Sequence, residues 1–369
     1  MPRALRVTIV AALAAFAICQ WAPRVGRAVP YAWHLPRGLP APSVPADNPM
    51  TQVKVDLGRR LFYDTRLSGN GRYACASCHQ QARAFTDGRA HAVGSTGGVH
   101  PRSTMSLTNV AYNVTYGWAD ASLRSLEAQM AVPMFNEHPI EMGMKGREAE
   151  IVARLTADRR MAARFRDAFP TDRPAVTIAN TVKAIASFER TLLSADSPFD
   201  RYLYRDDRQA MPPAALRGKD LFFSNRLRCS ECHASFNLSG PVTFERATPV
   251  RALFHNTGLY NVDGRGSYPA TDRGLVDRTN QSEDMGRFRA PTLRNVAVTA
   301  PYMHDGSVPT LRAAIAHYAS GGVNSPYKSD RLKGFTLTPQ QTVDLVAFLE
   351  SLTDRQFITN PAFARPTLR

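Results

Sequence analysis

The chain has 369 residues, enough for two domains with their own cores, and its 44% hydrophobic and 21% charged residues are typical of an ordinary soluble protein. Its formal net charge is +15, but the basic residues form no lysine-rich run and do not interleave with aromatic residues, so the composition does not indicate nucleic-acid binding. A basic protein can attract an acidic partner, although an evenly solvated basic surface gives the same net charge.

The N-terminus has the pattern of an export signal. Two arginines precede an apolar run over residues 7–19, which is short for a membrane span, and small residues follow up to Ala28. We therefore predict that residues 1–28 are a signal peptide and that the protein is periplasmic. The alternative is a signal that stays uncleaved and anchors the protein in the membrane.

Residues 29–49 are rich in proline, which favours an extended arm on the surface over a helix. The first folded segment begins near Met50, and apolar residues at helical spacing predict a helix over residues 53–63.

Two stretches, residues 75–79 and 229–233, both have the sequence Cys-x-x-Cys-His. Two thiols three residues apart can add to the two vinyl groups of a haem, and the following histidine can bind the iron. A zinc site needs further ligands at matching spacing, and a redox Cys-x-x-Cys does not need the histidine. The fifth cysteine, Cys19, leaves with the signal, so we predict two covalently bound haem c groups and no disulfide. The residues that hold them are Cys75, Cys78, His79, Cys229, Cys232 and His233.

The sequence around the first motif recurs around the second. GRRLFY at 58–63 corresponds to GKDLFF at 218–223, and SLTNVA at 106–111 corresponds to TLRNVA at 292–297. Such self-similarity indicates repeated structural units. We predict a mainly α-helical protein with two cytochrome c-like haem domains that arose by internal duplication.

Helical spacing also indicates the boundary between the domains. Apolar residues recur with a helical period over residues 147–169 and 176–193, and the pattern ends just before residue 200. We therefore predict an N-terminal haem domain over residues 50–200 and a C-terminal haem domain over residues 201–369.

The last predicted helix runs to Leu352 from Thr338, whose side chain forms a capping box with Gln341 and is followed by Pro339. Its apolar face is predicted to pack at the second haem and consists of Val343, Val346 and Leu349. Residues 257–286 are rich in glycine and are predicted to form a loop or lid.

Further short stretches accompany the haem motifs: DNP at 47–49, LGRRLFYD at 57–64, AFTDG at 84–88, EMG at 141–143 and APYMHDG at 300–306. Together they resemble the bacterial dihaem cytochrome c peroxidase and MauG superfamily over nearly all of residues 47–355. The proline-rich arm, GSTGG at 94–98 and VPMF at 132–135 are most similar to the dihaem enzymes of methanobactin operons, the MbnH family.

The resemblance implies that the first haem reacts with peroxide and has an open sixth coordination position. Simple peroxidases of the superfamily block this position with a histidine. Here the matching residue is Ser95, and we interpret the nearby His91 and His100 as surface loop residues. The resemblance therefore predicts a five-coordinate first haem at rest.

The distal acid/base pair of the superfamily matches Glu141 and Gln129, and its distal wall matches Pro133. A carboxyl group in this place can take a proton from peroxide and return it to the leaving oxygen. The alternative for Glu141 is an ordinary surface charge.

At the second haem, the methionine ligand of ordinary peroxidases aligns with Tyr318, as in MauG-like members with tyrosine ligation. An oxygen ligand lowers the haem potential and favours high-valent iron, whereas a thioether does the reverse. The alternative is a packing tyrosine with Met285 or Met303 as the ligand. His317 could also bind iron on chemical grounds, but it does not align.

Two further roles follow from the resemblance. Trp118 matches a tryptophan that lies between the haems and couples them electronically. Asn109, together with the backbone oxygens of Thr299 and Pro301, matches a calcium site between the haems, and all-oxygen ligation suits calcium.

The resemblance implies an enzyme that uses hydrogen peroxide to form a high-valent, bis-ferryl state and then oxidises a side chain of a partner protein, a tryptophan in MbnH-like enzymes. MauG carries a surface tryptophan two residues before its second motif, where this chain has Leu227, so synthesis of a tryptophan-derived quinone is not expected. One alternative is a cytochrome c peroxidase that takes electrons from a small redox protein. The other is a dihaem electron carrier without enzymatic activity.

Overall fold

The computed structural model describes residues 29–367, so the predicted signal peptide lies outside the described residues. The described chain is mainly helical, as predicted, and its only sheet pairs two short antiparallel strands, β1 (Phe254–His255) and β2 (Phe288–Arg289). The α-helices are α1 (Gln52–Phe62), α2 (Cys75–Cys78), α3 (Leu126–Phe135), α4 (Glu148–Ala157), α5 (Arg159–Ala168), α6 (Ile178–Glu189), α7 (Pro198–Tyr204), α8 (Pro213–Phe222), α9 (Val276–Thr279), α10 (Leu311–Ser320), α11 (Pro339–Glu350) and α12 (Arg355–Thr359).

Most predicted helices are present, with two differences. The stretch 147–169 forms two helices, because Asp158 leaves the helical conformation and its side chain accepts hydrogen bonds from the first backbone N–H groups of α5. Helix α11 has the predicted capping box at Thr338 and Gln341. Its predicted apolar face is wrong at Val343, which is 42% exposed, and right at Leu349, which lines the cavity at the second haem motif together with Leu345.

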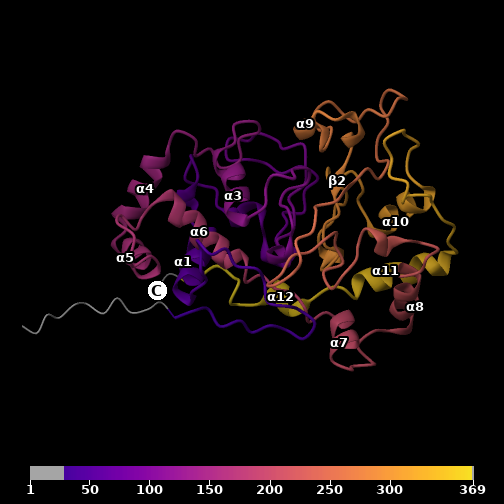
Figure 1. The fold of residues 1–369 in the computed structure, drawn as a ribbon, viewed down its shortest axis with the longest axis horizontal. Helices are drawn as coiled ribbons and strands as arrows, with labels where there is room; N and C mark the ends of the chain where they lie inside the picture. Colours follow the sequence, from indigo (N-terminus) through magenta and orange to yellow (C-terminus); the bar gives the residue numbers. More distant parts are fainter. Residues whose placement is uncertain (1–28, 368–369) are drawn as a thin grey trace, which may run out of the picture.

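Buried apolar residues form two main clusters, which lie side by side in Figure 1. The first gathers α1, α3, α4, α5 and α6 around the first haem motif. The second gathers α8, α10 and α11 around the second motif. Each motif therefore lies against its own hydrophobic core.

In each half, two helices cross at a glycine. A Cβ added at Gly58 in α1 would lie 1.8 Å from the carbonyl oxygen of Ala184 in α6. A Cβ added at Gly218 in α8 would lie 1.9 Å from the carbonyl oxygen of Asp344 in α11. Only glycine permits such a close approach of two helix backbones, so the repeated Gly of GRRLFY and GKDLFF occupies the same kind of contact in both halves.

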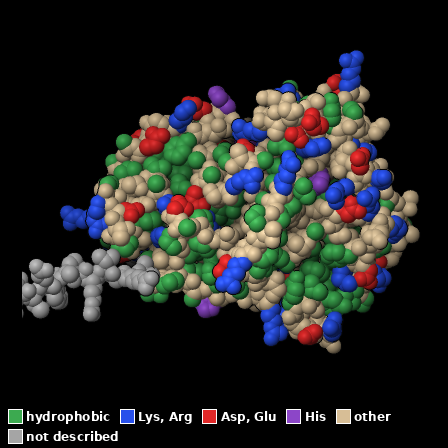
Figure 2. All heavy atoms as spheres, viewed as in Figure 1, with side chains coloured by type: hydrophobic (Ala, Val, Ile, Leu, Met, Phe, Trp, Pro, Cys, Tyr) green, Lys and Arg blue, Asp and Glu red, His purple; other side chains and the backbone are tan. Residues whose placement is uncertain are grey.

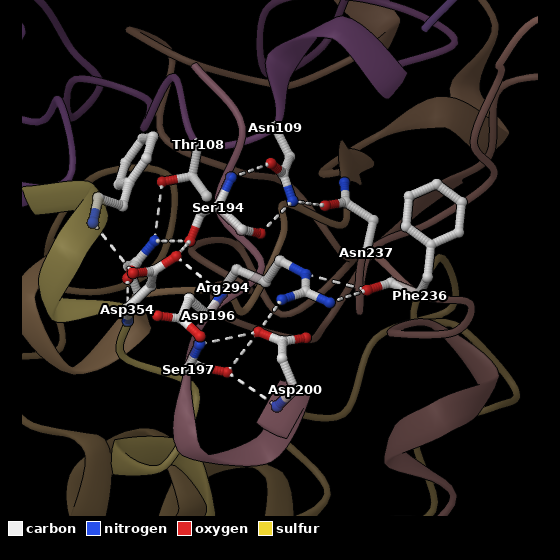
Figure 3. Close-up of polar contacts among 12 residues, drawn as sticks. Thr108, Asn109, Ser194, Asp196, Ser197, Asp200, Phe236, Asn237, Arg294 and Asp354 are labelled. Atoms are coloured by element: carbon white, nitrogen blue, oxygen red, sulfur yellow. Dashed lines mark hydrogen bonds and ion pairs between the residues drawn. The ribbon is translucent and has the colours of Figure 1, made fainter. Parts of the chain in front are cut away.

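A buried polar network joins the two halves (Figure 3). Its centre is an ion pair in which Arg294 Nη1 donates to Asp200 Oδ2 over 2.8 Å, with both side chains only 1% exposed. The guanidinium also donates twice to the carbonyl oxygen of Phe236, and the carboxylate accepts from the backbone and hydroxyl of Ser197. These hydrogen bonds offset the cost of removing both charges from water.

Two asparagines at corresponding places of the repeat extend this network. Asn109 Oδ1 accepts from the backbone N–H of Ser194, and Asn295 Oδ1 accepts from that of Asp354, each over 2.7 Å. Both asparagines have left-handed backbone angles, with φ of 54° and 62°. The Asn295 amide also donates to the Ser194 and Thr108 hydroxyls, so the ties of one half meet those of the other.

Both ends of the described chain cross between the halves. The proline-rich arm is extended and contains no helix, as predicted; Leu39 packs against Tyr112, whose hydroxyl donates to the Pro40 carbonyl, and the Ala41 carbonyl accepts from the backbone of Glu245. At the other end, α12 returns to the first cluster, where Phe357 packs with its ring centroid 5.6 Å from that of Phe85.

Charged side chains are spread over the surface. Figure 2 shows Lys and Arg interspersed with Asp and Glu on the visible face. Within residues 29–367, no helix combines the length and apolarity that crossing a membrane requires.

We expect Gly218→Ala to destabilise the protein by about 1–3 kcal/mol, because the added methyl group must push α8 away from α11. Denaturant unfolding of the haem-loaded protein measures this loss. Gly240→Ala is the matched control, since its added Cβ meets its nearest atom at an ordinary 3.9 Å. Equal stability of the two variants would contradict the prediction.

Candidate haem centres

At the first motif, Cys75 and Cys78 lie on the single helical turn α2, and a tight loop follows. Ala84 and Phe85 adopt left-handed backbone angles in this loop, which turns the Phe85 carbonyl back toward the motif. His79 Nδ1 donates to that carbonyl over 2.8 Å, which leaves Nε2 as the free lone pair. Burial lowers the pKa of His79, which favours the neutral imidazole that binds metals.

The second motif orients its histidine in the same manner. His233 Nδ1 lies 3.1 Å from the Pro291 carbonyl oxygen and 3.2 Å from that of Leu238, so Nε2 is again available. Burial lowers the pKa of His233 to about 4. None of the four cysteines in the two motifs is paired in a disulfide. Thiols, histidine tautomers and surroundings at both motifs therefore fit covalently bound haem c.

A cavity of about 290 Å³ adjoins the second motif. Cys229, Cys232 and His233 line it, and Tyr318 lines it from α10, which begins at the capping residue Thr310. Burial raises the pKa of the Tyr318 phenol, and the nearby Cys232 and Cys229 thiols raise it further. The predicted sixth ligand thus comes from a different helix to the same cavity as the predicted proximal ligand.

The alternatives to Tyr318 differ in their surroundings. His317 Nε2 donates to the Thr257 carbonyl over 2.9 Å, so this ring nitrogen is already engaged, and His317 itself does not line the cavity. Met285 packs in an aromatic cluster with Tyr268 and Phe288. Met303 does line the cavity, so two of the ligands considered from the sequence, the tyrosine and this thioether, lie there.

The predicted distal residues come together on the first half. The backbone N–H of Ser95 donates to the Glu141 carbonyl, and the backbone N–H of Met142 donates to the Pro133 carbonyl. Gln129 lies one turn before Pro133 in α3, and both are half-buried. The Glu141 side chain is 31% exposed, and burial raises its pKa to about 7, so near neutral pH it can both accept and release a proton.

The interpretation of His100 as a surface residue is wrong, whereas His91 is exposed as predicted. His100 is half-buried, and its Nε2 lies 3.9 Å from Glu141 Oε1. Its Nδ1 accepts from the backbone N–H of Arg102 over 3.1 Å, which places the proton of the neutral imidazole on Nε2, toward the carboxyl. Burial lowers the pKa of His100 to about 4. No feature of the sequence signals this contact, because it depends on how the loop folds back.

The same loop reaches the second half. Arg102 forms a bidentate ion pair with Asp272, with both N–O distances 2.7 Å and the carboxylate 5% exposed. His304 Nε2 lies 3.7 Å from the same carboxylate. The distal loop of the first haem site is thereby tied to the wall of the second cavity, which His304 lines.

Trp118 stands at this junction. Its ring lines the cavity, its indole N–H donates to the Ser103 carbonyl over 3.0 Å, and its own carbonyl accepts from the backbone of Arg289. Thr86, which follows the residue that holds His79, lines the same cavity. The tryptophan therefore lies where the surroundings of the two motifs meet.

The predicted calcium residues are only partly brought together. Thr299 and Pro301 line the cavity, whereas the Asn109 side chain is fully buried and bonded to Ser194 and Asn237. Residues 29–367 contain no group of three or more His, Cys, Asp or Glu side chains suited to a metal ion. The calcium site stays a prediction.

Comparison with known proteins decides the family. Residues 52–208 match the family described as di-haem cytochrome c peroxidase, and residues 287–317 match a RoxA-like, cytochrome c-like family. The chain is 38% identical to cytochrome-c peroxidase IdrP1 of Denitromonas iodatirespirans, over 85% of each protein. It is 34% identical to methylamine utilization protein MauG of Methylorubrum extorquens, over 86% of this chain and 82% of MauG.

The chain belongs to the di-haem cytochrome c peroxidase and MauG family. A crystal structure of a MauG-like protein associated with microbial copper homeostasis superposes with a TM-score of 0.88 at 45% identity, covering 91% of this chain and 99% of that one. Membership makes the protein a haem-dependent oxidoreductase of the peroxidase type with two haem c groups. The predicted superfamily and cofactor are thus confirmed.

We expect the peroxide reaction at the first haem to accelerate as pH rises through about 7, because only the deprotonated Glu141 carboxylate can take the peroxide proton. Glu141→Gln should slow the reaction by roughly 10²–10⁴-fold and remove this pH dependence. Stopped-flow absorbance of the haem after mixing with peroxide measures both effects. The matched control is Glu137→Gln, an exposed carboxylate paired with Lys145. A pH dependence that persists in Glu141→Gln would contradict the role of Glu141 as the proton acceptor.

Proposed function

We propose that this protein is a periplasmic enzyme that uses hydrogen peroxide to oxidise a side chain, a tryptophan, of a partner protein. Relatives named MauG and relatives named cytochrome c peroxidase both support a peroxide-using dihaem enzyme. The protein-oxidising branch is favoured by one observation, the position of Tyr318 on the wall of the cavity at the second motif.

The chemistry of the iron ligand explains why Tyr318 favours the protein-oxidising branch. A phenolate oxygen donates more charge to iron than a thioether sulfur, so it stabilises the more oxidised metal and lowers its potential. A haem held by His233 and Tyr318 is therefore suited to store an oxidising equivalent. A haem held by Met303 is suited to receive electrons from a small cytochrome.

The residues of the chain have separate tasks in the proposed reaction. Haem bound at the two motifs supplies the redox chemistry of peroxide reduction. Glu141 takes a proton from the entering peroxide and returns it to the departing oxygen, and Gln129 and Pro133 bound the space in which this happens. His100 presents its Nε2–H on the side of the Glu141 carboxyl, 3.9 Å from Oε1, which is too long for a direct hydrogen bond. Trp118 gives an aromatic ring between the sites, which shortens each electron-tunnelling step.

Leu227 bears on which oxidation product of the partner protein we expect. This side chain is 5% exposed and packs in the second hydrophobic cluster, so it offers no aromatic exit beside the motif. We therefore propose oxidation of a tryptophan, as in the kynurenine formation that the MbnH resemblance implies, rather than quinone synthesis. The 45% identity to a MauG-like protein associated with microbial copper homeostasis supports this choice.

The second candidate is a cytochrome c peroxidase, favoured by relatives such as Ccp of Escherichia coli, to which the chain is 34% identical. Such an enzyme removes peroxide with electrons from a small redox protein. The third candidate, a carrier without enzymatic activity, leaves the raised pKa of the partly buried Glu141 unexplained.

The decisive experiment adds stoichiometric hydrogen peroxide to the fully oxidised dihaem protein and follows both irons by Mössbauer and near-infrared spectroscopy. We expect both irons to respond and to hold the oxidising equivalents until a protein donor is added. Tyr318→Met should abolish this storage and raise the potential of the second haem, while Tyr202→Phe, a tyrosine outside the cavity, should change nothing. Turnover only after prior reduction supports the peroxidase, and no reaction at all supports the carrier.

We also propose the two haem domains over residues 50–200 and 201–369, derived by duplication. The glycine crossings at Gly58 and Gly218 and the equivalent ties of Asn109 and Asn295 support a common origin. A calcium ion at Asn109, Thr299 and Pro301 belongs to the same proposal.

Calcium can be tested against the structural role of Asn109. We expect a chelator to alter the visible spectrum of the wild-type protein and to lower its unfolding temperature. Asn109→Ala should remove this sensitivity, whereas Asn295→Ala, which breaks an equivalent set of ties, should destabilise the protein but keep it. Absence of calcium from the purified protein by elemental analysis contradicts the prediction.

A further inference from the structure

The loop that follows β1 carries a tyrosine with an unusual partner. The Tyr260 hydroxyl donates a hydrogen bond to Asp305 Oδ2 over 2.5 Å. Asp305 Oδ1 accepts a hydrogen bond from the backbone N–H of Ser307. By contrast, the hydroxyls of Tyr63, Tyr112 and Tyr302 donate to backbone carbonyls. A carboxylate can accept the proton outright, whereas a peptide carbonyl cannot.

Asp305 is suited to this task because it is ionised. Burial alone raises its pKa, but the hydrogen bonds from Tyr260 and Ser307 outweigh burial and hold the pKa below its usual value. Burial and the Asp305 charge raise the pKa of Tyr260, so the pair rests as a neutral phenol beside a carboxylate.

Aromatic rings connect this pair to the second haem cavity. The rings of Phe288 and His304 line the cavity and stack on one another at 3.7 Å. The buried Tyr268 ring lies 6.1 Å from Phe288 and 6.3 Å from His304 between centroids. Tyr260 lies 5.5 Å beyond Tyr268. Each step between rings is short enough for rapid electron tunnelling.

The two tyrosines of this series differ in their surroundings. Tyr268 is 3% exposed, and its hydroxyl is fixed between the Asn256 side chain and the backbone of Leu259, with no base to receive its proton. Tyr260 is only partly buried, and Val262 beside it is 63% exposed. The series therefore ends at the surface on the residue that has a base.

We propose that Tyr260 is the exit of the oxidising equivalent, the residue through which the second haem site draws an electron from a docked partner protein. This inference rests on the proposed function. Tyr260 gives one electron along the ring series to the haem site oxidised by hydrogen peroxide, and its phenolic proton moves to Asp305. A partner side chain then returns one electron to Tyr260, and Asp305 returns the proton. Two such cycles match the two electrons that one peroxide takes up in forming water.

Proton transfer explains why Tyr260 is paired with Asp305. A phenol that loses an electron becomes a very strong acid, so its oxidation is easy only where a base takes the proton at the same time. This surface route also accounts for the protein-oxidising branch without an aromatic residue at Leu227.

The test uses the protein with both haems bound and the spin trap DMPO in place of the partner. After stoichiometric peroxide, we expect freeze-quench electron paramagnetic resonance to show a tyrosyl radical whose signal narrows with ring-deuterated tyrosine. Peptide mapping should place the DMPO adduct on Tyr260. Tyr260→Phe should lose both signals, and Asp305→Asn, which keeps an acceptor oxygen but no base, should lose them at neutral pH.

Controls separate this inference from the proposed function. Tyr202→Phe should keep signal and adduct, and the haem spectrum and peroxide consumption should be unchanged in all three variants. If the wild type reacts with peroxide but the radical persists in Tyr260→Phe, the exit is elsewhere and the inference falls alone. If the wild type does not react with peroxide, the proposed function falls and the exit falls with it.

Discussion

The buried ion pair of Arg294 and Asp200 and the asparagine ties around it determine how the two haem centres are arranged. Buried charges are stable only where hydrogen bonds replace much of the lost water, and here Asp200 Oδ2 accepts from Arg294 and Ser197, while Asp200 Oδ1 has no hydrogen-bond partner among the described residues. The network joins the end of the first half, the Asp200 segment, to the repeat of the second half at Asn295. Electron transfer between two centres depends steeply on distance, so a junction fixed by hydrogen bonds also fixes a rate.

Around this junction the two halves use one scaffold for different purposes. Each asparagine accepts a hydrogen bond from the segment that follows the last long helix of its half. Nine residues after the asparagine the two copies differ, with Trp118 in one and His304 in the other. The tryptophan ring lines the cavity at the second motif, and its indole N–H donates to the Ser103 carbonyl. The histidine stacks on Phe288 and faces Asp272, in the aromatic wall that leads away from the cavity. Two corresponding positions of the sequence repeat thus carry different aromatic side chains with different contacts.

Sequence reasoning was strongest where chemistry is local. A Cys-x-x-Cys-His motif needs only five residues, and helices α1, α6 and α11 follow from apolar spacing and one capping box, so all were predictable. The break at Asp158 was missed because the apolar spacing continues across it. This spacing alone predicts one helix, although Asp158 caps the start of a second helix. Val343 was misplaced because several faces of α11 carry apolar residues and only the position of α8 decides between them.

Contacts between distant segments were beyond sequence reasoning. His100 and Glu141 lie 41 residues apart, and Tyr260 and Asp305 lie 45 residues apart, in loops without regular periodicity. The family resemblance could point to Glu141 because the superfamily shares it. It could not point to the histidine beside it or to the tyrosine pair, because those depend on how two loops fold against one another.

The return of α12 to the first half has a consequence for the order of assembly. Phe357 packs on Phe85, whose carbonyl holds the first haem ligand His79, and the side chain of Gln81 donates to the carbonyls of Phe357 and Asn360. The wall behind the first iron site therefore includes residues that follow the second haem motif in the chain. The site at the first motif can acquire this packing only after the second motif has been synthesised.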